Sequence, residues 1–362
     1  MRLQILFLSI ISSCLAAQPE PSLCQTYQND FLIGVALHSH YSPAEKTLLV
    51  HNFNALTPEN CMKPEATHPS EAQWTFEDGD DLVKLAVENH LQFFGHNLVW
   101  HNQTPNWFFL DGEKSASRDL VIARLKNHIQ TLVTRYRGKI RGWDVVNEAI
   151  SDKKDEYLRP TKWLAALGED YLVLAYRFAH EADPRAELQY NDYSIEEPVK
   201  RAKAVRLIKA LQAAGVPIAS VGIQGHWSLD KVPFADVEAS ILAFRELGVK
   251  VAITELDLDV IPRKVIGAEA SAHEQSNNEL VKSTPLSPEM AQRQAEQYAQ
   301  LFRLFLRYKT DIVRITFWGL DDGRSWLNTW PVKRYNHPLL FDRNLKPKPA
   351  FFAVLKAHDS EK

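Results

Sequence analysis

The chain has 362 residues, of which 45% are hydrophobic and 24% are charged, with 42 basic residues against 45 acidic ones. A formal net charge of −3 provides no overall field that would attract nucleic acid or an anionic membrane, so neither is expected as a partner. Its three cysteines are too few for a disulfide scaffold and lack metal-ligand spacing, although a bridge between Cys24 and Cys61 stays open.

The first residues are typical of an export signal. Met1 and Arg2 precede the apolar run 3–11, and a stretch of small residues ends at Ala17. This run is too short to span a bilayer core of roughly 30 Å, and no later stretch approaches the ~20 apolar residues that a span needs. We therefore expect residues 1–17 to be removed and the mature chain to be secreted or periplasmic. Alternatively, the leader ends in a lipid-attachment box at Cys14, which would anchor the chain.

Eight short β-rich runs recur along the rest of the chain, separated by longer segments with helical periodicity. The runs are 31–36, 53–57, 92–99, 142–146, 187–190, 220–223, 249–254 and 313–317. Buried strands that alternate with amphipathic helices predict an α/β fold with a parallel sheet, and eight such units predict its closure into a (β/α)8 TIM barrel. An open doubly wound sheet is the alternative, but no glycine-rich nucleotide-binding motif follows any of the runs.

A single catalytic domain over residues 25–360 is expected, because no internal repeat and no Gly/Ser-rich or Pro-rich linker divides the chain. The segment 261–288 is polar and without clear periodicity, which is typical of a long loop after the seventh strand. Loops of this length are usually either functional or poorly ordered, and both interpretations stay open.

Polar and aromatic residues follow most of the predicted strands, at the ends that converge on one face of a barrel. Glu148 after the fourth strand and Glu255 after the seventh stand out among them. A retaining glycosidase needs a carboxylic acid that protonates the leaving oxygen and a carboxylate nucleophile about 5–5.5 Å away. A lone carboxylate at a strand end is more often structural, but this pair in this topology favours glycoside hydrolysis.

Several ordered blocks make the sequence similar to a known family. The blocks are 57–64 (TPENCMKP), 95–103 (GHNLVWHNQ), 143–148 (WDVVNE), 190–193, 222–226, 253–257, 317–322 and 325–326. They closely resemble the signature blocks of glycoside hydrolase family 10, the endo-β-1,4-xylanases, and the resemblance covers residues 29–356. It implies a TIM barrel that hydrolyses internal β-1,4-xylosidic bonds of xylan with retention, with no metal and no other cofactor.

Carried over residue by residue, the resemblance assigns roles around the two carboxylates. Glu148 is expected to be the acid/base and Glu255 the nucleophile, so Glu148 must start the reaction protonated. His226 and Asp257 are expected to hold the nucleophile ionised and aimed. The sugar-binding residues that the resemblance implies are Glu59, Asn60, Lys63, His96, Trp100, Gln103, Asn147, Tyr193, Gln224, His226, Trp318 and Trp326.

These sugar-binding residues differ in the contacts that they are expected to make. Trp100, Trp318 and Trp326 present flat apolar faces that match the C–H faces of a pyranose ring. Closure of Trp318 and Trp326 over the glycone side is expected to exclude the hydroxymethyl group of glucose and so to favour xylose. Asn147 is expected to hold the 2-hydroxyl, and Tyr193 to stack on an aglycone sugar.

Two other functions stay open at this stage. A barrel hydrolase of the same mechanism could act on β-1,4-glucan, with cellobiohydrolase-like activity on cello-oligosaccharides. A non-catalytic carbohydrate-binding protein on a decayed scaffold would have lost one carboxylate, whereas both Glu148 and Glu255 are present. The expected partner is a polysaccharide, and the chain is expected to be a monomer.

Overall fold

The computed structural model describes residues 21–261, 285–330 and 333–359. The predicted leader with Cys14, and most of the predicted loop 261–288, lie outside these residues, so export and lipid anchoring stay predictions. Within the described ranges, no helix is long and apolar enough to cross a membrane. Cys24 and Cys61 are both free, and no disulfide joins them.

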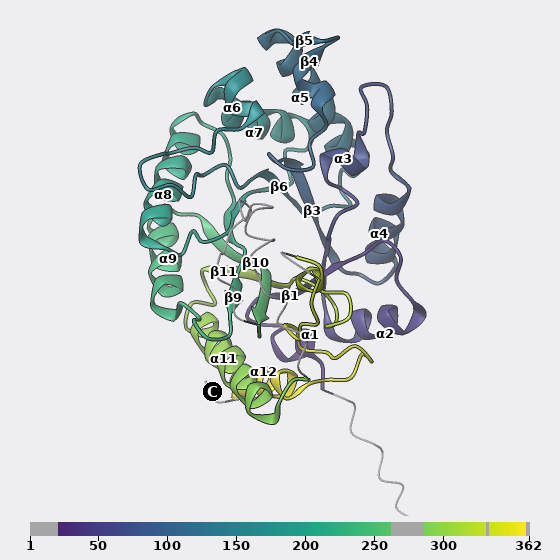
Figure 1. Cartoon of the computed structure of the whole chain (residues 1–362), viewed down its shortest axis with the longest axis vertical. Helices are drawn as coiled ribbons and strands as arrows, with labels where there is room; N and C mark the ends of the chain where they lie inside the picture. Colours follow the sequence, from purple (N-terminus) through teal and green to yellow (C-terminus); the bar gives the residue numbers. More distant parts are fainter. Residues whose placement is uncertain (1–20, 262–284, 331–332, 360–362) are drawn as a thin grey trace, which may run out of the picture.

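Within the described residues, eight parallel strands form a closed barrel with helices around it (Figure 1). Around the barrel their order is β11, β1, β2, β3, β6, β7, β8 and β10, and pairing of β10 with β11 closes the ring. Their bounds are Leu32–Leu37 (β1), Ala55–Pro58 (β2), Gln92–Val99 (β3), Gly142–Asn147 (β6), Glu187–Asp192 (β7), Ser220–Ile223 (β8), Lys250–Asp259 (β10) and Ile312–Phe317 (β11). The predicted TIM barrel is confirmed.

The observed strands differ from the predicted runs mainly at their C-terminal ends. β7 continues to Asp192 and β10 to Asp259, past the points where polar residues suggested loops. The extension of β10 has a partner, because the short strand β9 (His226–Ser228) pairs with residues 257–259. The antiparallel hairpin of β4 (Leu110–Asp111) and β5 (Lys114–Ser115) was also not predicted.

The helices surround the barrel, and the buried apolar side chains of both layers form one contiguous core. Their bounds are Leu23–Thr26 (α1), Pro43–Asn52 (α2), Pro64–Thr67 (α3), Glu77–Glu88 (α4), Arg118–Arg135 (α5), Lys162–Leu167 (α6), Asp170–Ala182 (α7), Pro198–Ala213 (α8), Phe234–Glu246 (α9), Pro288–Arg307 (α11) and Pro349–Asp359 (α12), with 3-10 turns at Asn106–Phe109 (η1) and Trp326–Asn328 (η2). Local signals explain where helices begin: the Ser287 hydroxyl accepts from the backbone N–H of Met290, and Pro288 occupies the first turn of α11.

The first and last helices of the described residues, α1 and α12, pack against each other on one side of the barrel (Figure 1). The Tyr27 hydroxyl donates to the backbone carbonyl of Val354 at 2.6 Å. A second link joins the His358 imidazole to the Asp30 carboxylate at 3.1 Å. The two described ends of the chain are therefore held side by side.

A glycine in the barrel wall makes room for a side chain of the site. A Cβ at Gly222, on β8, would lie 2.4 Å from the Asn191 amide oxygen and 2.7 Å from the Thr254 methyl group. Both distances are shorter than van der Waals contact allows. The absence of a side chain at position 222 thus leaves the Asn191 amide free to point into the barrel mouth.

Candidate active site

A cleft of about 780 Å³ opens at the C-terminal ends of the barrel strands. Every residue that the sequence assigned to the site lines it, except Asp257, which lies behind His226. The lining residues are His38, Glu59, Asn60, Lys63, His96, Trp100, Asn102, Gln103, Asn147, Glu148, Tyr193, Gln224, His226, Glu255, Trp318, Gly323, Arg324, Ser325, Trp326, Asn328, Thr329 and Trp330.

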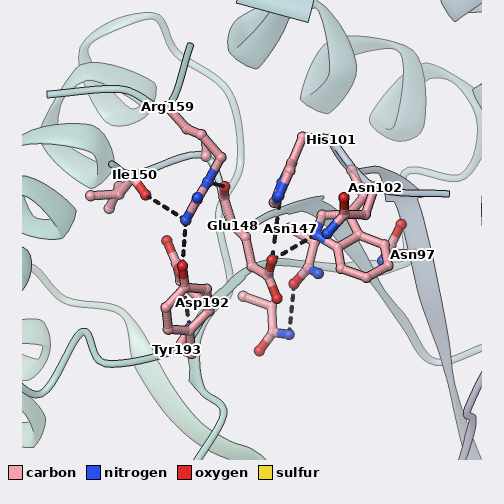
Figure 2. Close-up of polar contacts among 12 residues, drawn as sticks. Asn97, His101, Asn102, Asn147, Glu148, Ile150, Arg159, Asp192 and Tyr193 are labelled. Atoms are coloured by element: carbon pink, nitrogen blue, oxygen red, sulfur yellow. Dashed lines mark hydrogen bonds and ion pairs between the residues drawn. The ribbon is translucent and has the colours of Figure 1, made fainter. Parts of the chain in front are cut away.

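Glu148 follows directly after β6 and is held by uncharged donors. The Trp100 indole N–H donates to Oε2 at 2.7 Å, and the Gln224 amide donates to Oε1 at 3.0 Å. The His101 ring also points at this carboxyl group, with Nδ1 4.0 Å from Oε2 (Figure 2). Burial lowers the pKa of His101 to about 4, so the ring is neutral near pH 7.

Glu255 lies within β10, at an irregularity of the barrel. The pairing of β10 with β11 shifts register between Ile253 and Leu256, and such bulges often re-aim side chains beside active sites. The buried carboxylate accepts from the Asn191 amide at 2.8 Å, and its other oxygen lies 3.1 Å from His226 Nε2.

His226 bridges Glu255 to a second buried carboxylate. Its Nδ1 lies 3.0 Å from Asp257 Oδ2, which also accepts from the Trp326 indole N–H at 2.8 Å. Burial by itself would lower the pKa of His226, but Asp257 and Glu255 outweigh burial and raise that pKa to about 9. At neutral pH the ring is therefore a cation that donates to both carboxylates.

Asn191 connects the nucleophile candidate with Asn147. The side-chain amides of Asn191 and Asn147 hydrogen-bond to each other at 2.9 Å, while the Asn191 amide also reaches Glu255. The Thr254 hydroxyl donates to the Asn191 oxygen at 2.6 Å and fixes its orientation. Asn191 belongs to the block 190–193, yet its position in the sequence gave no sign of this bridging contact.

Polar residues after β2 form a chain of hydrogen bonds at another part of the cleft. The Lys63 ammonium donates to the Asn60 oxygen at 2.8 Å, and the Asn60 amide donates to Glu59 at 3.3 Å. His38, which sequence reasoning missed, lies with Nε2 2.9 Å from the other Glu59 oxygen. The Lys63 ammonium also lies 4.9 Å from the centre of the Trp100 ring.

Two of the predicted tryptophans lie against imidazole rings of the cleft. Trp318 packs edge-to-face on His96, with ring centres 5.2 Å apart, and Trp326 lies 4.8 Å from His226. Trp330, which the sequence did not suggest, stacks on Trp326 with ring centres 4.8 Å apart. Trp330 lies four residues after Trp326, and that spacing was an available signal of two rings on one side of the segment.

Comparison with known proteins identifies the family of this fold and cleft. The model of "Glycosyl hydrolase family 10" matches residues 22–357. The chain belongs to glycosyl hydrolase family 10. The resemblance that the sequence blocks indicated is confirmed.

Family 10 proteins with similar sequences and structures cover nearly all of this chain. "Endo-1,4-beta-xylanase B" of Paenibacillus barcinonensis is 43% identical over 337 residues, which are 92% of this chain and 98% of that protein. "Endo-1,4-beta-xylanase A" of Xylanibacter ruminicola is 43% identical over 361 residues, covering 97% of each chain. The crystal structure of xylanase XynB from Paenibacillus barcinonensis, complexed with a conduramine derivative, superposes with a TM-score of 0.87 at 42% identity, covering 93% of this chain and 99% of that one.

Tyr193 makes more contacts in this family 10 cleft than a stacking residue needs. Its hydroxyl donates to Asp152 and accepts from the Arg159 guanidinium. The Lys200 ammonium lies 3.5 Å from the centre of its ring, so a cation occupies one face. Aglycone stacking on Tyr193 stays a prediction, and the opposite ring face is the one that it requires.

The other lining residues that the sequence did not assign come from the segments that follow β3 and β11. They are Asn102, Gly323, Arg324, Ser325, Asn328 and Thr329. Among the described residues, no group of three or more His, Cys, Asp or Glu side chains is arranged to hold a metal ion.

Proposed function

We propose that this chain is an endo-acting retaining hydrolase of the internal β-1,4-xylosidic bonds of xylan. The observation that carries the proposal is the contrast between two carboxyl groups in one cleft. Glu255 faces the cationic His226 ring at 3.1 Å, whereas Glu148 receives hydrogen bonds from the neutral Trp100 and Gln224 side chains. A cation favours an ionised nucleophile, and neutral donors tolerate an acid that gains and loses a proton.

In the first step, Glu148 gives its proton to the glycosidic oxygen as Glu255 attacks the anomeric carbon. The carbon–oxygen bond to the aglycone breaks, and a covalent glycosyl-enzyme ester forms. In the second step, ionised Glu148 takes a proton from water as the water oxygen attacks the same carbon and releases Glu255. Asn147 hydrogen-bonds to Asn191, and its proposed role is to hold the sugar 2-hydroxyl, a contact that strengthens in the transition state.

The choice of xylan rests on the relatives and on the aromatic residues of the cleft. Both relatives from Paenibacillus barcinonensis and Xylanibacter ruminicola carry the name endo-1,4-β-xylanase and match this chain over nearly its full length. Trp318 and Trp326 line the cleft beside His226, where their bulk favours a sugar without a hydroxymethyl group.

The test is product release from linear xylan by the wild-type chain and by the variants Glu148→Ala and Glu255→Ala. We expect fresh product to appear first as the β-anomer by NMR, and both variants to lose at least ~10³-fold in rate. Carboxymethyl-cellulose is assayed beside xylan, and a much lower rate on it is expected. Product that appears first as the α-anomer contradicts retention, and a higher rate on carboxymethyl-cellulose contradicts the substrate.

A further inference from the structure

The segment after Glu148 folds back on itself and returns an arginine to the catalytic strand. Ile150 pairs with Leu158 in an antiparallel bridge, and the backbone N–H of Arg159 donates to the carbonyl of Ala149 at 2.8 Å. The Arg159 side chain then points back toward β6. Its Nε donates to the backbone carbonyl of Glu148 at 3.2 Å, and its Nη2 to that of Ile150 at 3.4 Å (Figure 2).

The backbone that Arg159 holds has an uncommon conformation. Glu148 has a φ of +56°, in the left-handed region that residues with a Cβ seldom adopt. Such a conformation is strained and persists where surrounding contacts determine it. Arg159 donates one hydrogen bond to the backbone carbonyl of Glu148 and one to that of Ile150. These two bonds hold the turn that orients the Glu148 carboxyl group.

The Arg159 guanidinium also binds two side chains beside the cleft, Tyr193 and Asp152. It donates to the Tyr193 hydroxyl and pairs with Asp152 Oδ2 at 3.2 Å. Lys200 binds Asp152 at 2.8 Å, which ties the ion pair to helix α8. The Arg159 side chain is buried, with only 3% of it exposed, and it is not among the residues that line the cleft.

We propose that Arg159 is a positioning residue for the acid/base, which sets the direction of the Glu148 carboxyl group and couples it to Tyr193. This inference rests on the proposed function and deepens it. Arg159 does not touch the substrate, so it acts through Glu148. Proton transfer depends steeply on position, and a misplacement of about 1 Å can cost ~10²-fold in rate. A variant at Arg159 therefore weakens proton donation more than it weakens attack by Glu255.

Leaving groups of different basicity separate these two effects. Phenoxide needs a proton from Glu148 to leave, whereas 2,4-dinitrophenoxide leaves without one. The value of kcat/KM reports the steps up to formation of the glycosyl-enzyme, so it isolates proton donation from the later water attack. Phenyl and 2,4-dinitrophenyl β-xylobioside are therefore the two probes.

For Arg159→Met we expect kcat/KM to fall ~100-fold on the phenyl substrate and by no more than about 3-fold on the dinitrophenyl substrate. Arg159→Lys keeps the charge but lacks the planar guanidinium group, so we expect kcat/KM to fall about 10-fold on the phenyl substrate.

The matched control is Arg334→Met. The Arg334 side chain is also only 5% exposed. It binds the Asp259 carboxylate at 2.7 Å and the Leu327 carbonyl at 2.9 Å, in a different loop of the barrel mouth.

An equal loss on both substrates in Arg159→Met, or a phenyl-specific loss in Arg334→Met, overturns the proposal. Thermal unfolding of each variant shows which of them fold. If Arg159→Met does not fold, the ratio of the two rates measured for Arg159→Lys decides the question.

The variant Glu148→Ala separates a failure of the role proposed for Arg159 from a failure of the function proposed for Glu148. If it shows the phenyl-specific loss and the Arg159 variants do not, only the role of Arg159 is wrong; if it does not, the assignment of Glu148 is wrong.

Discussion

The two carboxyl groups that are proposed to act in catalysis, Glu148 and Glu255, differ in the charge of the side chains that donate to them. Around Glu148 the donors are an indole and an amide, and the nearby His101 ring is neutral. Around Glu255 the donors are an amide and the His226 cation. The same residue type therefore occupies two electrostatic settings, and the settings match the two tasks of a retaining hydrolase.

Because Glu148 follows β6 and Glu255 lies on β10, the barrel can surround the two carboxyl groups with different side chains. In the proposed mechanism Glu148 gains and loses a proton in every cycle, so a cation that donated directly to its carboxyl group would oppose the gain of that proton. The nucleophile side keeps its charge until the ester forms, so the cation stabilises the form that attacks. Asp257 and Glu255 together favour the charged form of His226, and Asp257 does so without lining the cleft.

The largest effect is expected from removing the cation. His226→Gln keeps a donor beside Glu255 but not the charge, and we expect kcat/KM on xylan to fall ~10³-fold. His358→Gln is the matched control, because His358 also pairs with a carboxylate, Asp30 at 3.1 Å, far from the cleft in the sequence and in the fold. A loss of less than about tenfold in His226→Gln would show that the charge is not what distinguishes the two carboxyl groups.

The raised pKa of His226 also makes the stability of the fold depend on pH. Its ordinary value is 6.5, and the folded value is about 9. The stabilisation is thus fully present below pH 6.5 and is lost as the pH rises through 9. The difference corresponds to about 3 kcal/mol in the free energy of unfolding. Urea unfolding at several pH values should show this decline in the wild-type chain and a flatter profile in His226→Gln; equal slopes would contradict it.

The smallest effect is expected on the neutral side. Trp100→Phe keeps an aromatic ring beside Lys63 but loses the N–H that donates to Glu148, and we expect about a tenfold lower kcat/KM on phenyl β-xylobioside. Trp326→Phe is the matched control, since it loses an indole N–H to Asp257 instead. Its effect should be similar on phenyl and dinitrophenyl substrates, whereas that of Trp100→Phe should fall mainly on the phenyl substrate. A loss confined to the phenyl substrate in Trp326→Phe, with equal losses on both substrates in Trp100→Phe, would mean that the Trp100 N–H does not assist proton donation by Glu148.

The sequence predicted the barrel and placed both catalytic candidates because these features depend on order along the chain. Glu148 and Glu255 each follow or end an apolar run, and the carboxyl ends of parallel strands meet on one face. The full length of β10 escaped prediction, because its polar end is stabilised by pairing with His226 to Ser228, a contact between distant segments.

The contacts that orient the site were not predictable for the same reason. Arg159 lies eleven positions after Glu148 in a charged loop and carries no local mark of its return to β6. His38 ends up beside Glu59 only because β1 and β2 are neighbours. Trp100 was expected to stack its ring on a sugar. Its position in the sequence did not predict that the indole N–H donates to Glu148.

The contact between helices α1 and α12 brings the two described ends of the chain close enough to be joined. Tyr27 and Val354, and Asp30 and His358, hold the described ends together at short range. A short linker between them would allow the chain to be opened elsewhere without separating any strand from its neighbour. The exposed turn at Gly215, after helix α8, lies at the barrel end opposite the cleft and is a suitable opening for circular permutation.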